Sequence, residues 1–338
     1  MGEIFDLLVH RPFSWLLLQL YAMTNSYALA IILFALVSKI VLLYFTAKGK
    51  LGSMRQQRVQ LKLKPIQKQY ASDKEKLNAE TMKMYQAEGV SPMGGCLWML
   101  LPWPVLIALY TVIREPLTRL MNFPRDVNTK ELVAQIQEIF GQNRLEHLVE
   151  HVSGSGVYPQ LELAQIVHEN FEMVNASFGG VLRDIDFSLF GTNLANIPKM
   201  PWAEPGWIWL IPLVSATTAY GQFLVSTRMS KLPENPQTKY MSLLGPVMSL
   251  WFGFIMPAAM SLYWIANNVF GMAQDAYLSV KYNKQLDEED KRKAELEARR
   301  KEAEAKQKEE DRIRRAEAMA KKNKNAKKYK MTKHPKKK

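Results

Sequence analysis

Long apolar stretches alternate with strongly charged ones along the whole chain. Crossing a bilayer as a helix takes about 20 consecutive apolar residues. Five stretches approach or reach that length: Tyr27–Thr46, Leu97–Ile113, Gly206–Val225, Met241–Met256 and Ala258–Tyr277. The last two are separated only by Pro257, and one helix through both would far exceed the hydrocarbon thickness at about 1.5 Å per residue. The pattern therefore predicts an all-α membrane bundle of five transmembrane helices, with a tight hairpin between the fourth and the fifth.

The charge of the segments between these spans predicts their orientation. Ala47–Gly95 carries ten Lys and Arg against four acids, and Lys281–Lys338 carries twenty-three against twelve. In contrast, Pro116–Pro205 carries six against eleven. Because basic loops stay in the cytosol, we expect residues 47–95, 226–240 and 281–338 inside, and residues 1–26 and 114–205 outside. A bacterial plasma-membrane protein with its N-terminus outside and its C-terminus in the cytosol fits all of these constraints.

The segments outside the spans have helical patterns of their own. Residues 1–26 mix apolar and charged positions as an interfacial amphipathic helix would, with a break at Pro12. Residues 47–95 predict a cytosolic helical hairpin, with one helix over Leu51–Tyr70 and a second, capped by Ser72, reaching Ala87. The external segment predicts two amphipathic helices, about Thr129–His151 and Pro159–Ser177, forming a small helical cap.

The residues that would support an enzyme are missing from the sequence. There is one cysteine, Cys96, so neither an intramolecular disulfide nor a cysteine zinc cluster can form. His168-Glu169 is not followed by the second histidine of an HExxH site, and no GxSxG motif occurs. We expect no catalytic residue, no metal and no cofactor. The amino terminus also lacks the pattern of a cleavable signal peptide.

Hydrogen-bonding side chains recur at helical spacing inside three of the spans. Ser215, Thr218 and Gln222 share one face of the third span. In the fifth span the residues Asn267, Asn268, Gly271 and Gln274 form a second stripe, close to Trp264. Lipid cannot satisfy these groups. They either bond one another across helices, at roughly 0.6 kcal/mol each, or line a hydrated groove.

Lys39 is the most unusual residue of the first span, because a charge near the middle of a membrane helix costs roughly 2.5–3.5 kcal/mol or more. It precedes Thr46, on the same face, by seven residues, so the charge lies roughly 10 Å short of the cytosolic end. Snorkelling of the flexible stem would recover only part of that distance. Together with the polar stripes, Lys39 favours a hydrophilic groove that carries a buried cation in the inner half of the membrane.

Two long motifs resemble the YidC/Oxa family of membrane protein insertases. KLKPIQKQYASDKEKLNAETMKMYQAEGVSPMGGC (62–96) resembles that family's cytosolic hairpin, and PAAMSLYWIANNVFGMAQ (257–274) resembles its Pro…LeuTyrTrp…Asn…Gln signature. DFSLFGTNLA (186–195) and TTAYGQ (217–222) also fit. The similarity covers about residues 20–280, and the lack of a large domain near the amino terminus resembles the short, five-span bacterial form.

The resemblance implies an insertase and chaperone without covalent chemistry, whose partners are nascent membrane proteins and the lipid bilayer. Lys39 matches a position where the family usually has arginine. Gln222, Asn268, Gln274, Tyr263 and Trp264 match positions lining or flanking the groove. In the second span Trp98 replaces the usual proline and Pro102 the usual glutamine, and in the fifth Ala259 and Met260 replace a common Gly-Leu pair. Whether the protein works alone or beside the Sec translocon stays open.

The basic tail, Lys281–Lys338, predicts a charged helix without an apolar stripe and a disordered KKNKNAKKYK…KHPKKK end. A solvated extension, binding to anionic lipids and docking to ribosomal RNA are three readings of it, and the resemblance favours the ribosome. For the chain as a whole, the alternative to an insertase is a small-solute or ion transporter or channel, since buried charges also mark solute pathways. Against that stands the lack of an inverted repeat between the two halves.

Overall fold

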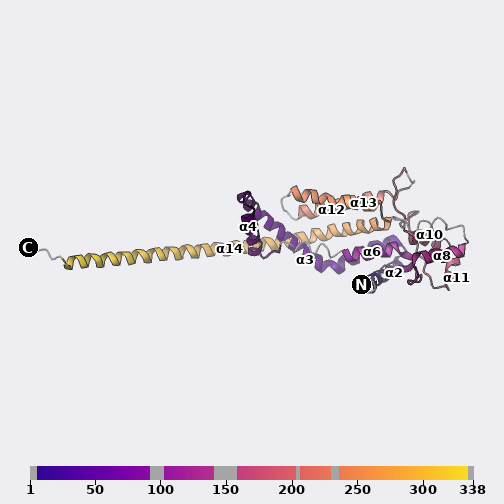
Figure 1. The fold of residues 1–338 in the computed structure, drawn as a ribbon, viewed down its shortest axis with the longest axis horizontal. Coiled ribbons are helices and arrows are strands. Elements are labelled where there is room, and N and C mark those ends of the chain that lie inside the picture. The colour runs from indigo at the N-terminus through magenta and orange to yellow at the C-terminus, as the bar shows by residue number, and fades with distance from the viewer. Residues whose placement is uncertain (1–5, 92–102, 141–157, 203–205, 230–235, 334–338) are drawn as a thin grey trace, which may run out of the picture. The chain divides into compact units, whose positions relative to one another are not determined.

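The computed structural model describes residues 6–91, 103–140, 158–202, 206–229 and 236–333 (Figure 1). Apart from one two-stranded hairpin, the regular structure in these ranges is helical. Residues Met1–Val280 form one compact unit and Lys281–Lys338 a second, and each is described by itself below. An all-α architecture is thus confirmed.

The first helical element changes type just before a proline. A π-helical turn, η1 (Asp6–His10), is followed by α2 (Arg11–Thr24), which has Pro12 in its first turn, where no amide donor is needed. α2 ends at Asn25, whose left-handed backbone (φ 48°) lets its N–H donate to the Tyr21 carbonyl. The next helix follows almost at once, because the Ser26 hydroxyl caps it by accepting from the Leu29 amide.

One continuous helix, α3 (Tyr27–Gln69), replaces the two that the sequence predicts. It begins at Tyr27, where the apolar stretch begins, but it runs unbroken through the predicted boundary at Thr46 and past Pro65. The predicted helix over Leu51–Tyr70 is present up to Gln69, but it continues the helix that begins at Tyr27 instead of starting a new one, since no proline lies between the two segments. Of the described helices, α3 alone has the length and apolar content of a bilayer span; α6 and Leu243–Gly253 of α13 are shorter apolar helices. The five-span count stays a prediction.

The turn after α3 is capped by a different residue from the one expected. Asp73, not Ser72, caps α4 (Lys74–Ala87), and its Oδ1 accepts from the Lys76 amide at 3.0 Å. An aspartate at this position also favours the positive end of the helix dipole. An ion pair between Lys62 and Glu88 ties α4 back to α3.

The segment after α6, predicted to be external, is more broken than its pattern predicts. It contains α7 (Pro116–Arg119), α8 (Thr129–Phe140), α10 (Pro159–Glu169) and α11 (Phe171–Ser177), preceded by α6 (Trp103–Arg114). The predicted single helix over Pro159–Ser177 is wrong, because the chain leaves helical geometry at Asn170 (φ −127°). The predicted continuation of α8 toward His151 lies outside the described residues. The antiparallel hairpin of β1 (Ser188–Leu189) and β2 (Thr192–Asn193) has no counterpart among the predictions.

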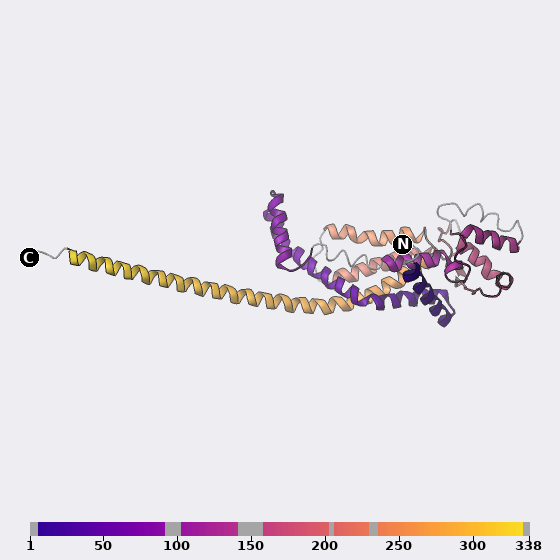
Figure 2. The ribbon, with the colours of Figure 1, turned by 60° about the horizontal axis from the view of Figure 1, so that its bottom comes forward.

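Three further helices complete the chain: α12 (Leu210–Met229), α13 (Pro236–Gly253) and α14 (Ala258–Lys333). α12 and α13 lie side by side (Figures 1 and 2), and the break at Pro257 separates α13 from α14 as predicted. α14 has 76 residues and continues to Lys333. The prediction of disorder in the tail is therefore wrong up to that residue. Ala, Glu, Lys and Arg are all strong helix formers, and i,i+4 pairs such as Arg300–Glu304 (3.0 Å) support the helix.

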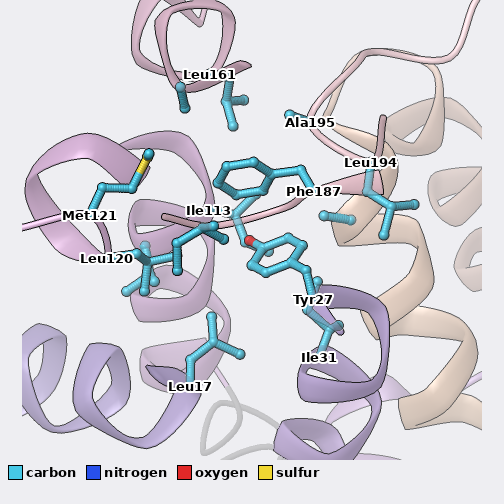
Figure 3. Close-up of a cluster of buried hydrophobic side chains, with 14 of the residues drawn as sticks. Leu17, Tyr27, Ile31, Ile113, Leu120, Met121, Leu161, Phe187, Leu194 and Ala195 are labelled. Carbon is cyan, nitrogen blue, oxygen red and sulfur yellow. The ribbon is translucent and has the colours of Figure 1, made fainter. Parts of the chain in front are cut away.

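The main core lies where residues from α6 to the β1–β2 hairpin meet the starts of α3 and α14. Tyr27 packs edge-to-face on Phe187, with ring centroids 4.7 Å apart. Around this pair gather buried residues from α2, α3, α6 and the turn after α7 (Figure 3), among them Leu17, Ile31, Ile113, Leu120 and Met121. The helices from α6 to α11 thus share one core with the starts of α3 and α14.

Candidate functional site

The polar stripes of α12 and α14 face each other. The Asn268 amide of α14 donates to the Thr218 hydroxyl at 3.2 Å and to the Ser215 carbonyl at 3.4 Å. The Thr218 hydroxyl in turn donates to the Ser215 carbonyl at 2.9 Å. Ser215 is fully buried, and its hydroxyl bonds that of Ser249 in α13 at 2.8 Å. Around Ser215, hydrogen bonds between helices thus satisfy the polar side chains of the two stripes.

One turn further along, a glycine brings α12 and α14 close together. A Cβ built on Gly271 would lie 2.4 Å from Nε2 of Gln222. Any other residue at 271 would therefore displace the Gln222 amide. Gln222 and Gly271 lie on the same faces of their helices as the pair above, so the two stripes face each other over about two turns.

The stripe of α14 then turns to α3. Gln274 Nε2 donates to the Thr46 hydroxyl at 2.6 Å. The next residue, Asp275, forms an ion pair with Lys50 of α3 at 3.2 Å, and Lys50 also donates to the Ser226 hydroxyl of α12 at 2.8 Å. The Lys50 ammonium thus joins three helices at one point, and its side chain is only 13% exposed.

Lys39 is half-buried and lies on α3 about three helical turns before Lys50. Asp275 attracts it electrostatically, but among the described residues Lys39 forms no ion pair, since the Asp275 carboxylate is taken by Lys50. The two lysines share one aspartate, so Lys39, Lys50 and Asp275 together carry a formal charge of +1. The ammonium of Lys39 is therefore the part of this cluster that has no close anion.

Three predicted site residues stand apart from these hydrogen bonds. Tyr263 is 6% exposed and packs near Phe34, with centroids 6.5 Å apart. Trp264 packs on Phe252 of α13 at 6.1 Å. Asn267 is half-buried and takes no part in the contacts above. The replacements at Trp98 and Pro102, and Cys96 beside them, lie outside the described residues.

Four residues of this site are not among those predicted from the sequence: Lys50, Ser226, Ser249 and Asp275. A signal for Asp275 exists, because it follows Asn268 and Gly271 at i+7 and i+4, on the same stripe, and is an acid inside an apolar stretch. Lys50 lies beyond the apolar stretch among many other cations, so only the fold selects it.

A family model described as "60Kd inner membrane protein" matches residues 19–289. The chain belongs to this family. The 60Kd inner membrane protein family is the YidC/Oxa family of the sequence resemblance, and the match covers α3, α12, α13 and the site just described. Membership makes the chain a membrane protein.

Curated relatives carry the same family name over most of this chain. The "Membrane protein insertase YidC" of Syntrophobacter fumaroxidans is 24% identical over 80% of this chain and 38% of its own length. Those of Mycobacterium leprae and Mycobacterium tuberculosis are 26% and 25% identical, over 85% and 86% of this chain and 73% and 76% of their own lengths. The chain thus spans less than two fifths of the first relative and about three quarters of the mycobacterial ones.

Proposed function

We propose that the protein is a membrane protein insertase and chaperone, with α3, the segment containing α6, α12, α13 and the start of α14 as five membrane spans. The proposal rests on family membership, since its relatives are named insertases. The family is not one of enzymes, so the protein's task is physical: it lowers the cost of moving a polar segment of a client into the membrane.

A half-buried cation, Lys39, that has no ion-pair partner among the described residues is the observation that carries the mechanism. Lys39 faces the carboxylate of Asp275 only from a distance, because Lys50 holds it. An acidic residue in the tail of an incoming client would form an ion pair with the Lys39 ammonium. Two opposite charges 4 Å apart attract by about 4 kcal/mol at an effective dielectric constant near 20, which offsets part of the cost of bringing the tail below the membrane surface.

Polar side chains between α3, α12 and α14 would supply the rest of a hydrophilic groove open to cytosol and lipid. At rest, Asn268 and Gln274 bond partners on neighbouring helices. Such bonds contribute only roughly 0.6 kcal/mol in membranes, so a client backbone can replace them at small cost. The client's apolar helix then partitions into lipid, and the hydrogen bonds of Asn268 and Gln274 to the neighbouring helices form again.

The test is insertion of a single-span client with an acidic tail into vesicles holding the Lys39→Ala variant. We expect insertion to fall about tenfold or more, since each 1.4 kcal/mol of lost attraction is a factor of ten. Lys39→Arg should restore most of it, because the charge is kept.

Two controls make the result specific. Lys48→Ala removes an exposed lysine that lies over the Tyr44 ring at 4.4 Å, only nine residues further along α3, and should leave insertion unchanged. A client whose tail acids are replaced by amides should depend much less on Lys39. Equal insertion of the acidic client by Lys39→Ala and Lys48→Ala would rule out the role of the charge.

The tail after Asp287 we assign to docking on ribosomal RNA, whose phosphates attract polycations. The Sec translocon stays a candidate partner on the sequence resemblance alone.

A further inference from the structure

The tip of the β1–β2 hairpin carries an exposed aromatic residue, Phe190, in a backbone conformation that is unfavourable for phenylalanine. Ser188 pairs with Asn193 and Leu189 with Thr192, so Phe190 and Gly191 form a two-residue turn. Both have positive φ (47° and 74°), as in a type I′ turn. Glycine and asparagine suit such positions, whereas phenylalanine does not. Phe190 is nevertheless there, with 88% of its surface exposed.

The base of this hairpin is fixed in the protein core. Phe187 and Leu194 are both buried, and Figure 3 shows them beside Tyr27, the first residue of α3. Backbone amides of Ala258 and Ala259, the first residues of α14, donate to the carbonyls of Asn196 and Leu194, both at 2.9 Å. The hairpin is therefore held at the level where two of the proposed spans begin.

A tryptophan links the tip to the apolar surface of α12. The Trp207 indole N–H donates to the Phe190 carbonyl at 3.4 Å, and the two rings lie 6.2 Å apart. Trp207 lies in the turn just before α12, where its carbonyl accepts from the Leu210 amide at 2.9 Å. Leu210 and Val214, four residues apart, share one face of α12. Leu210 and Val214 are 41% and 47% exposed. The Phe190–Trp207 pair thus continues an exposed apolar face of a proposed span.

We propose that Phe190 and Trp207 form an anchor that inserts into the outer headgroup region of the bilayer and fixes the height of the external segment. Aromatic residues favour this region of the membrane. Behind the tip, the polar groups of Ser188 are already hydrogen-bonded within the hairpin: the Asp186 carboxylate accepts from the Ser188 amide and hydroxyl, both at 2.8 Å. Only the tip is therefore suited to lipid. This anchor goes beyond the insertase function but uses the same set of proposed spans.

Lipid, rather than a partner protein, is the occupant that the geometry favours. The aromatic pair is small and is continuous with the face that α12 would turn to lipid. The exposed ring lies at the level where two proposed spans begin. A bilayer around these spans would contact the ring at all times, whereas a partner protein would contact it only when bound.

The experiment places a nitroxide label at Ser188→Cys in a Cys96→Ser background, in vesicles of phosphatidylcholine and phosphatidylglycerol that hold no other protein. Oxygen concentrates in lipid and a chelated nickel complex stays in water, so their collision rates with the label report its depth. We expect the oxygen-to-nickel ratio to be several-fold higher than for a label at Glu172→Cys, an exposed position of α11. Phe190→Asn should bring the ratio at 188 down toward that of 172.

Asparagine tolerates positive φ better than phenylalanine, so Phe190→Asn keeps the hairpin, which an unchanged unfolding temperature would verify. A label at 188 that is as open to nickel as the one at 172, or that does not respond to Phe190→Asn, overturns the anchor. A label shielded only after other proteins are added would instead indicate a protein partner and also overturns it. Neither outcome affects the insertion test at Lys39, so the two proposals fail separately.

Discussion

At the scale of the residue, one carboxylate serves two lysines of α3. Asp275 pairs with Lys50 at 3.2 Å and attracts Lys39 from further away. The side chains of the pair are 13% and 22% exposed, so water screens it less than a surface pair. Lys50 also bonds Ser226, and the junction therefore joins α3, α12 and α14 through one ammonium group.

Replacing Asp275 by Asn should lower the free energy of unfolding by about 1–3 kcal/mol, because Lys50 loses a charge-assisted bond and stays partly buried. Lys50→Gln should have an effect of similar size. The double variant should lose less than the sum of the two, and unfolding of the four proteins in detergent measures the coupling. Strict additivity would contradict the ion pair.

A second cluster of charges, outside the proposed spans, predicts a pH dependence. Asp6 accepts from Arg119, from Arg11 at 3.2 Å and from His10 at 3.3 Å. Burial acts to raise the pKa of the Asp6 carboxyl, but the hydrogen bonds from Arg119 and Arg11 outweigh it, and the pKa falls below its ordinary value of 3.8. The folded state therefore binds this proton less well than the unfolded state.

The stabilising effect of Asp6 is then complete above about pH 4 and disappears as the pH falls through the lower, folded pKa. We expect Asp6→Asn to be less stable than the wild type by about 1 kcal/mol at neutral pH. The difference should shrink toward zero on acidification, which thermal unfolding of both proteins between about pH 7 and pH 3 measures. A difference that does not change with pH would contradict this assignment.

At the scale of the element, glycines let α12, α13 and α14 approach each other closely. Gly271 accommodates Gln222, and Gly221 lies against Met272, whose sulfur would be 3.3 Å from an added Cβ. At the end of α13, a Cβ on Gly253 would meet the Cβ of Pro212 at 2.7 Å and its backbone Cα at 3.1 Å. Such close packing is how helices associate where water provides no hydrophobic driving force.

Gly253→Ala should therefore destabilise the protein by about 1–3 kcal/mol, because the ring and backbone of Pro212 cannot turn aside as a flexible side chain could. Gly245→Ala is the matched control in the same helix, since nothing lies within 4 Å of its added Cβ. It should be neutral or slightly stabilising, as alanine favours helices. Unfolding of the two variants in the same detergent compares them, and equal stabilities would contradict the close contact.

At the scale of the whole molecule, the charge of the chain is unevenly divided. Residues 288–320 carry eleven Lys and Arg against eleven acids, whereas residues 321–338 carry ten against none. Within the second unit, every residue from Lys291 to Asn323 is exposed. The tail thus combines a helix of balanced charge with a polycationic end, and the end should supply most of the attraction to phosphates.

Deleting all residues after Asp287 should lower the affinity for ribosomes at low salt. Deleting only 321–338 should cause most of that loss, and deleting only 288–320 should cause little, because the ten cations remain. The affinity of the wild type should fall steeply with salt, since each neutralised phosphate releases counterions. Co-sedimentation at several salt concentrations measures all four proteins, and equal binding by all of them would remove the ribosome from the list of partners.

Helix starts, helix breaks and polar stripes can be predicted from the sequence, because each depends on residues that are close together in the chain. The start of α3 at Tyr27 follows from the Ser26 cap and the apolar run behind it, and the break before α14 follows from Pro257. The polar stripes of α12 and α14 follow from helical periodicity. The charged tail is a counter-example, because its helix-forming composition outweighs the low complexity that indicated disorder.

Which side chains contact each other across different helices depends on the folded structure. Nothing in the sequence pairs Lys50 with Asp275, since 225 positions separate them and Lys50 is one of many cations. The hairpin at 188–193 likewise depends on Phe187 packing against Tyr27, a contact between segments far apart in the chain. Periodicity and capping act over a few residues, so the helices and the faces they present can be predicted from local sequence. Charge pairing and core packing act between helices, and they were settled only when the chain folded.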